Sequence, residues 1–354
     1  MLEWVLSASR QTRILDVAAR AVLIAVAVLV TAVSHAQIED GPPAQANKKI
    51  MFLASNLRNG GVKAVNDSFA QAAKQLKWKV EVVDCVGNRS LAAKELKKLK
   101  DKSFDGIVIG GFDGADFRSE LKKLRKLGVK TVGWHAASKS GATPDLFFNV
   151  TTDPIDVANT ATKQLTSFGA KSGGVIILTD RDFAVATAKT LAMKKNIEGM
   201  ADFKLLEVED LSIAKSDSEI AHLVKAWNQK FGKTWTHTIA INDIYFDNMA
   251  SSLKDVKRDD VVGIAAGDGS EEAVDRIRTL KATQLVTIAE PLKMQGWQLA
   301  DELNRAFAGE APSYFQSELI VVSKKYLDSL KGSDIEERLD YQNTYMNIWY
   351  PKKH

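Results

Sequence analysis

Short apolar runs alternate with longer segments of helical periodicity along most of the chain. The near-continuous apolar runs predict strands at residues 49–55, 80–84, 106–109, 130–134, 174–178, 204–208, 238–241, 260–264 and 284–288. Apolar residues three and four apart predict helices at 62–76, 91–99, 121–127, 155–168, 184–198, 216–231, 271–279 and 292–308, with another through Leu253. Apolar strands separated by amphipathic helices are typical of a parallel sheet covered on both faces. The pattern therefore predicts an α/β fold.

The alternation breaks once and then starts again. A weak strand at 146–150 is followed by Thr-Thr-Asp-Pro at 151–154, and the strand–helix pattern resumes from residue 155. The chain has 354 residues, which is more than one hydrophobic core usually serves. We therefore expect two doubly wound parallel-sheet domains with a first crossover at 151–154. A further strand at 318–322 follows the last helix, and the polar, aromatic segment 334–354 does not fit the repeat.

The first residues have the three-part pattern of a secretory signal peptide. Arg10, Arg13 and Arg20 precede an apolar run at 21–33, and Ser34 and Ala36 occupy the −3 and −1 positions of a cleavage site. The alternative is an uncleaved anchor, although the apolar run is short for a membrane span. We expect a signal peptide at 1–36, cleavage after Ala36, and a flexible leader at 37–47.

Composition excludes several classes of protein. A net charge of +4 is too small for a nucleic-acid binder. Cys85 is the single cysteine, so an intrachain disulfide is impossible, and its place after an apolar strand favours a half-buried thiol over a nucleophile. The sequence has no His-x-x-x-His, cysteine cluster or Gly-x-Ser-x-Gly. We therefore expect no catalytic residues, no metal and no cofactor, and hence no enzyme.

Polar and aromatic residues gather where the predicted strands end. In open parallel sheets, ligands bind beyond the carboxyl ends of the strands. Asn and Asp offer fixed hydrogen-bonding atoms to hydroxyl or amine groups, and Trp and Phe offer apolar faces. The candidate residues at these ends are Ser55, Asn59, Trp134, His135, Phe183, Asn242, Asp268 and Glu290. Two domains that face each other with such ends would enclose a ligand cleft.

Structural roles compete with ligand binding at two of these positions. Asp268 lies between two glycines and could be a turn residue, although the end of a strand favours a ligand role. Asn242 could cap the next helix, bind a ligand, or do both. Its neighbour Asp243 is the more natural pure cap.

The residues near the predicted cleft also leave alternatives open. Trp134 is more typical of a core residue than of a stacking platform. His135 could contact a ligand, lie buried in a hydrogen bond, or act as a pH-sensitive clamp. Gly60 and Gly61 could serve a turn with positive φ, or they could leave room for a larger ligand.

Residues 48–325 resemble the periplasmic sugar-binding proteins of the ribose-binding type, which are receptors of ABC importers and share their fold with LacI-type repressors. The resemblance is carried by the strand order and by four local strings. These are Phe-Leu-Ala-Ser at 52–55 followed by Asn59, Asn-Val-Thr-Thr-Asp at 149–153, Ala-Ile-Asn-Asp at 240–243, and Val-Gly-Ile-Ala-Ala-Gly-Asp-Gly-Ser at 262–270. A repressor would have a helix-turn-helix where this chain has its predicted signal peptide.

The resemblance implies a multi-crossover hinge and ligand capture by closure of the two domains. The first domain would comprise 48–152 plus 290–317, the second 153–289 plus 318–333, and 334–354 would be a C-terminal extension. Ser55, Asn59, Asn242 and Asp268 match ligand residues of the family. Glu290 stands where a glutamine is common, and Lys189 stands near the place of a ligand arginine.

Two departures from the family pattern concern the ligand itself. The paired phenylalanines that stack on a sugar ring are replaced by Gly61 and Val62, and an Asp-Arg pair is replaced by His135 and Ala136. Loss of the arginine removes a bidentate donor that lysine cannot replace. The pocket is therefore expected to take a ligand other than ribose or a simple hexose.

We predict an exported, periplasmic solute-binding protein that captures a small polar, polyhydroxylated ligand and delivers it to an ABC permease. The alternative is a periplasmic sensor that presents its ligand state to a chemoreceptor or a histidine kinase, with the aromatic segment 334–354 as the surface that a partner would contact. In either case we expect a monomer that binds no nucleic acid.

Overall fold

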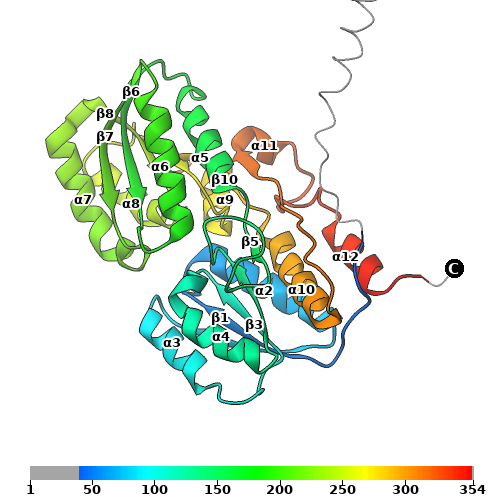
Figure 1. The fold of residues 1–354 in the computed structure, drawn as a ribbon. Helices are drawn as coiled ribbons and strands as arrows, with labels where there is room; N and C mark the ends of the chain where they lie inside the picture. Colours follow the sequence, from blue (N-terminus) through cyan, green and yellow to red (C-terminus); the bar gives the residue numbers. More distant parts are fainter. Residues whose placement is uncertain (1–39, 353–354) are drawn as a thin grey trace, which may run out of the picture. The chain divides into compact units, whose positions relative to one another are not determined.

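The computed structural model describes residues 40–352, which contain two separate sheets with helices on both faces of each (Figure 1). The predicted signal peptide and its cleavage site lie outside these residues. Within the described range, no helix has the length and apolar character needed to cross a membrane. The α/β fold class predicted from the alternation of strands and helices is confirmed.

The first sheet has the strand order β2-β1-β3-β4-β5, and all of its pairs are parallel. Its strands are β1 (Lys49–Ala54), β2 (Lys79–Asp84), β3 (Gly106–Gly110), β4 (Lys130–Trp134) and β5 (Asn149–Val150). Helices α3 (Arg89–Lys98) and α4 (Arg118–Lys126) cover one face, and α2 (Gly60–Gln75) and α10 (Leu292–Ala308) cover the other. We call this sheet with its four helices the N-terminal lobe.

The second sheet has the order β11-β10-β9-β8-β6-β7. Its strands are β6 (Gly173–Thr179), β7 (Phe203–Asp210), β8 (Trp235–Ala240), β9 (Val262–Ala265), β10 (Gln284–Ala289) and β11 (Ile320–Ser323). Its helices are α5 (Pro154–Lys163), α6 (Ala184–Glu198), α7 (Ser216–Phe231), α8 (Ile244–Asp255), α9 (Glu271–Thr279) and α11 (Lys324–Asp328). We call this assembly the C-terminal lobe. Strand β11 runs antiparallel to β10, so this sheet is parallel except at one edge.

Several helices begin where a polar side chain accepts backbone N–H groups that the first turn leaves free. Asn59 Oδ1 accepts from Gly61 N at 2.9 Å at the start of α2. Asp153 Oδ1 accepts from Ile155 N at 2.7 Å, with Pro154 in the first turn of α5. Ser270 Oγ accepts from Ala273 N at 3.2 Å at the start of α9. Each of these caps directly follows a strand or a crossover, so they place helix N-termini at the carboxyl edges of the sheets.

The chain passes between the lobes three times, at residues 151–153, 290–291 and 309–319. The domain boundaries predicted at 152/153, 289/290 and 317/318 fall in or beside these connecting segments. These three domain boundaries stay a prediction, because the lobes are defined here by their sheets and not by separate domain limits.

The C-terminal extension packs on α10. Its helix α12 (Tyr341–Trp349) was not expected from the strand–helix repeat. Trp349 stacks on Trp297 of α10 with ring centroids 5.5 Å apart, and Tyr345 lies beside both rings. Tyr341, Tyr345 and Trp349 are all buried. The aromatic side chains that suggested a surface for a partner therefore form a small core with α10.

The leader and the extension also fix the two ends of α10. We expected residues 37–47 to be flexible, but Gln45 N donates to Asn304 Oδ1 at 2.8 Å and Asn304 Nδ2 donates to Pro42 O at 3.0 Å. At the other end, Glu336 accepts from Lys293 N and Met294 N at 2.9 Å each. The described part of the leader is thus held against the N-terminal lobe.

Candidate functional site

A cavity of about 510 Å³ lies between the carboxyl edges of the two sheets. The residues predicted as ligand contacts that line it are Ser55, Asn59, Trp134, His135, Phe183, Lys189, Asn242 and Asp268. Strand-end positions that we did not single out also line it, among them Asn56 after β1 and Phe112 after β3. Glu290 does not line the cavity and is fully buried behind its wall. The cavity therefore draws its wall from both lobes, where parallel sheets place ligands.

Asp268 is held by a neighbouring strand end. Asn242 Nδ2 donates to Asp268 Oδ2 at 2.6 Å, and Asn242 Oδ1 accepts from Ile244 N at 3.0 Å. Burial raises the pKa of Asp268 above its ordinary value, while the charges of His135 and Lys189 act in the opposite direction. Asn242 thus combines a helix-start bond with orientation of the cavity carboxylate, so both of its expected roles are compatible.

Asp243 does not cap α8 with its side chain. Its carboxylate accepts from Gly269 N at 2.7 Å, Ser270 N at 3.2 Å and Gln284 Nε2 at 2.6 Å. Burial raises its pKa to about 6. The expected capping role is wrong, because the loop that carries Asp268 supplies better donors than the helix itself. Asp243 therefore fixes the position of that loop.

Gly60 and Gly61 permit a close approach of the two lobes. Neither has a positive φ, so the expected turn role is wrong. A Cβ atom at Gly61 would lie 2.4 Å from Asp268 Oδ2, and one at Gly60 would lie 2.7 Å from Ser270 Cβ. Side chains at these positions would collide with the C-terminal lobe. The space beside Gly61 is occupied by the Asp268 carboxylate.

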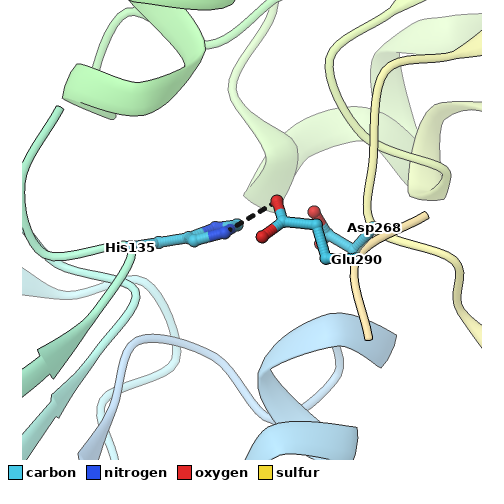
Figure 2. A group of neighbouring side chains, drawn as sticks. All are labelled: His135, Asp268 and Glu290. Atoms are coloured by element: carbon cyan, nitrogen blue, oxygen red, sulfur yellow. Dashed lines mark ion pairs between the residues drawn. The ribbon is translucent and has the colours of Figure 1, made fainter. Parts of the chain in front are cut away.

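His135 and Lys189 in the wall of the cavity form a buried ion-pair network with Glu290 behind it. Figure 2 shows the His135–Glu290 pair. His135 Nε2 lies 2.9 Å from Glu290 Oε1, and Lys189 Nζ lies 3.6 Å from the same oxygen. The His135–Glu290 contact lacks the geometry of a hydrogen bond. Burial would raise the pKa of Glu290, but His135, Lys189 and Gln295 hold it well below its ordinary value. Glu290 is therefore a carboxylate that balances the Lys189 ammonium.

The donor set of this network resembles that of a metal site. One atom each of His135, Asp268 and Glu290 lies within 4.8 Å of the others, and Figure 2 shows the three side chains converging. However, the Lys189 ammonium lies beside Glu290 Oε1 and donates to Ala266 O at 2.8 Å. That ammonium already balances the carboxylate and would repel a divalent cation. We therefore assign the group as an ion-pair network.

The second oxygen of Glu290 joins the segments that connect the lobes. Glu290 Oε2 accepts from Thr152 N at 3.1 Å and from Gln295 Nε2 at 2.9 Å. Gln295 Nε2 also donates to Ser317 Oγ at 3.0 Å. Thr152, Glu290 and Ser317 each belong to a different connecting segment. We call Thr152, Glu290, Gln295 and Ser317 the hinge network. Gln295 and Ser317 could not be predicted as site residues, because their hydrogen-bond partners are distant in the chain.

The two aromatic candidates differ in their surroundings. Trp134 is 1% exposed, stacks on the His135 ring at 3.9 Å, and donates from Nε1 to Gln295 Oε1 at 2.7 Å. It thus borders the cavity as a core residue attached to the hinge network. Phe183 is only partly buried and stands at the start of α6. Phe183 is therefore the aromatic ring better placed to contact a ligand.

An arginine bridges the lobes at the outer end of the cavity. Arg89 Nε lies 3.0 Å from Asp116 Oδ2 in its own lobe, and Arg89 Nη1 lies 3.3 Å from Asp182 Oδ1 in the other. Its guanidinium also donates to the Asp182 carbonyl. Nothing in the sequence singled out this contact, since Asp182 is distant in the chain. The Arg89–Asp182 pair is a lobe-to-lobe contact in the closed arrangement.

Cys85 is fully buried, and burial together with the nearby Asp84 raises the pKa of its thiol to about 11. A thiol of this kind is protonated and inaccessible at neutral pH, so it is no candidate nucleophile.

Comparison with known proteins identifies the family. The chain matches the family described as "periplasmic binding protein domain" over residues 50–311. No curated protein matches it significantly. Among solved structures, a 5-methylthioribose transporter solute-binding protein from Thermotoga lettingae has a TM-score of 0.74 at 12% identity, over 88% of this chain and 97% of that chain. A sugar ABC transporter protein from Yersinia enterocolitica has a TM-score of 0.72 at 17% identity, over 86% and 95%.

A third similar structure is a XylFII–LytSN complex, with a TM-score of 0.66 at 15% identity over 79% of this chain and 98% of that chain. At these identities the structures establish the fold, and the family match establishes the membership. The matched family is one of binding proteins. The chain belongs to the periplasmic binding protein family.

Proposed function

We propose that the chain is an exported solute-binding protein. It captures a small, uncharged, polyhydroxylated molecule between its lobes by hinge closure and delivers it to an ABC-type permease. The observation that carries this proposal is the cavity of about 510 Å³ at the strand ends of both lobes, with its buried amide and carboxylate groups. The predicted signal peptide supports a periplasmic location, and the family membership supports the transport role.

The charges around the cavity favour a neutral ligand. The lining carries the carboxylates of Asp180, Asp182 and Asp268 and the cations of Arg89 and Lys189. Arg89 pairs with Asp182, and Lys189 pairs with Glu290 behind the wall, so both cations are already balanced within the protein. Asp180 and Asp268 accept hydrogen bonds from groups of the protein itself. Asn59, Asn242 and Asp268 instead offer directional bonds to hydroxyl groups.

The test is ligand binding by the mature chain, residues 37–354, measured by thermal shift and calorimetry against a panel of sugars, polyols and nucleosides. We expect at least one of these compounds to bind. The Asp268→Asn variant should then lose at least tenfold in affinity, while the exposed control Asp202→Asn should bind normally. A panel without any binder, or equal binding by both variants, would contradict the proposal.

The alternative function is a periplasmic sensor. One similar structure was solved as a complex of two proteins, XylFII and LytSN. This complex supports a protein partner as the alternative to a permease. The segment 334–354 no longer favours this alternative, because three of its four aromatic side chains, Tyr341, Tyr345 and Trp349, are buried. Uptake of labelled ligand by cells that lack the protein separates the two functions. Lost uptake supports transport, and normal uptake with a lost transcriptional response supports sensing.

A further inference from the structure

The cavity wall formed by α6 is apolar near the start of the helix and charged further along it. Phe183 at the start of the helix is partly exposed, Val185 and Ala186 follow as buried apolar residues, and Lys189 is buried to 2% exposure. One helix face therefore presents apolar groups at the outer end and an ammonium at the inner end. Hydroxyl groups beside the apolar part would lose water without gaining hydrogen bonds.

Apolar side chains from two other loops complete the outer wall. Val86 comes from the loop after β2, and Ile213 and Ala214 come from the loop after β7. The lobes meet there, because a Cβ atom at Gly87 would lie 3.5 Å from Ala214 Cβ. The outer end of the cavity is thus bordered by apolar groups from both lobes, beside the Arg89–Asp182 ion pair.

Val86 is held in an unfavourable conformation. It has a φ of +48° and is 55% exposed. A β-branched residue rarely adopts this region of backbone space without a reason. The loop is fixed there, since Val86 N donates to Asp84 Oδ1 at 3.0 Å and Gly87 N donates to Ser55 O at 2.6 Å. The fold therefore keeps an exposed valine at the cavity at a conformational cost.

The inner end is polar, with Asn59, His135, Lys189, Asn242 and Asp268. The whole cavity, about 510 Å³, falls within the range of roughly 300–1,000 Å³ that takes drug-sized ligands. A polar ring bound at the inner end leaves the apolar outer end for a further part of the ligand.

We propose that the ligand is a polyhydroxylated ring that carries an uncharged alkyl or aryl substituent. The ring hydroxyls bind Asn59, Asn242 and Asp268, and the substituent contacts Val86, Phe183 and Ile213. This inference rests on the proposed solute-binding function and narrows its ligand class.

Matched pairs of probes test the inference. Common pentoses, hexoses and inositols are each compared by calorimetry with their own butyl and phenyl derivatives. We expect the substituted member of the binding pair to bind at least tenfold more tightly than its parent. The Val86→Ser and Ile213→Ser variants should remove most of this gain and leave the affinity for the parent compound unchanged. Ile155→Ser is the matched control, since Ile155 is exposed and outside the cavity.

The outcomes separate the two proposals. Equal or tighter binding of the parent compound overturns the apolar subsite and leaves the solute-binding function in place. Equal losses for parent and derivative in the Val86→Ser variant also overturn it; Val86 is exposed, so this variant does not disturb a core. Failure of every pair to bind overturns both the subsite and the proposed function.

Discussion

Asp268 of the C-terminal lobe lies against Gly61 of the N-terminal lobe, where a Cβ atom would come within 2.4 Å of the Asp268 Oδ2 atom. The same oxygen accepts a hydrogen bond from Asn242, so it cannot move away freely. The carboxylate that borders the cavity is thus also a contact between the lobes. In the proposed function, ligand binding and closure would therefore both depend on this side chain.

We expect Gly61→Ala to impair closure. The added methyl group would force Asp268 from its position, so ligand affinity should fall at least tenfold. The free energy of unfolding should change little without ligand, because alanine suits the first turn of α2. Calorimetry gives the affinity, and small-angle scattering gives the compaction on ligand addition. Gly199→Ala is the control, since its nearest neighbour would lie at 3.4 Å. Normal affinity and compaction in Gly61→Ala would contradict this role.

Removal of the Glu290 charge should destabilise the protein. Glu290→Gln would leave Lys189 and His135 without their carboxylate, and loss of one partner of a buried pair costs about 3–5 kcal/mol. Urea unfolding measures the change. In the double variant Glu290→Gln/Lys189→Met the loss should be smaller than the sum of the single losses. Strictly additive losses would show that the two residues are not coupled.

Stability should depend on pH through Glu302. Burial raises its pKa to about 7 in the folded protein, above the ordinary glutamate value of 4.5 that applies to the unfolded chain. The folded state therefore binds the proton more tightly, so its contribution is fully present below pH 4.5 and is lost as the pH rises through 7. The loss is about 3 kcal/mol at most. Urea titrations from pH 4 to pH 8 should show a smaller decline in Glu302→Gln than in the wild type.

Glu310→Gln is the control for this pH dependence. Glu310 is exposed and follows the C-terminal end of α10, the helix that carries Glu302. It should follow the wild-type curve. A Glu302→Gln profile parallel to that of the wild type would exclude Glu302 as the titrating group.

Arg89→Ala should speed ligand release modestly. The Arg89–Asp182 pair joins the lobes, but both side chains are substantially exposed, so it contributes about 0–1 kcal/mol. We expect the dissociation rate to rise by up to about fivefold at low salt and by less at high salt. Stopped-flow measurements at two salt concentrations test this. Arg181→Ala, which breaks a pair with Asp210 inside one lobe, should leave the rate unchanged.

Trp349→Ala should destabilise the N-terminal lobe. Trp349 is 1% exposed, stacks on Trp297, and donates from Nε1 to Asp301 Oδ1 at 2.8 Å. Loss of such a ring costs about 3–5 kcal/mol, which chemical denaturation would detect. Tyr350→Ala should cost far less, because Tyr350 is 40% exposed. Equal stability of the two variants would mean that the extension packs only weakly.

The periodicity of the sequence predicted the regular elements well. The bounds of α6, α7, α9 and α10 agree with the expected ranges. In α6, α7 and α9 the buried apolar residues lie on one side of the helix, whereas α10 is buried on nearly all sides. The antiparallel β11 and the helix α12 were not foreseen. Strand direction depends on the crossover, and α12 is fixed by contacts with α10 that no local pattern encodes.

The candidate site was predictable in position but less so in its detailed roles. The strand-end rule correctly placed residues such as Asn59, Asn242 and Asp268 on one cavity. The roles of Glu290, Asp243 and Arg89 depend on partners far away in the sequence. Single-sequence reasoning finds the edge of a sheet, whereas the assignment of hydrogen bonds across three connecting segments requires the structure.

In the proposed opening motion, the hinge network would act as the pivot. Thr152, Glu290 and Ser317 are joined through buried hydrogen bonds, so a rotation that opens the cleft would turn about an axis near Glu290. Atoms close to that axis travel little, and atoms near Arg89 travel furthest. The hydroxyl-binding end would keep its arrangement in the open receptor, whereas the apolar outer wall would assemble only as the lobes come together. A ligand with an ill-fitting substituent would then bind to the open receptor, but the lobes would not stay closed around it.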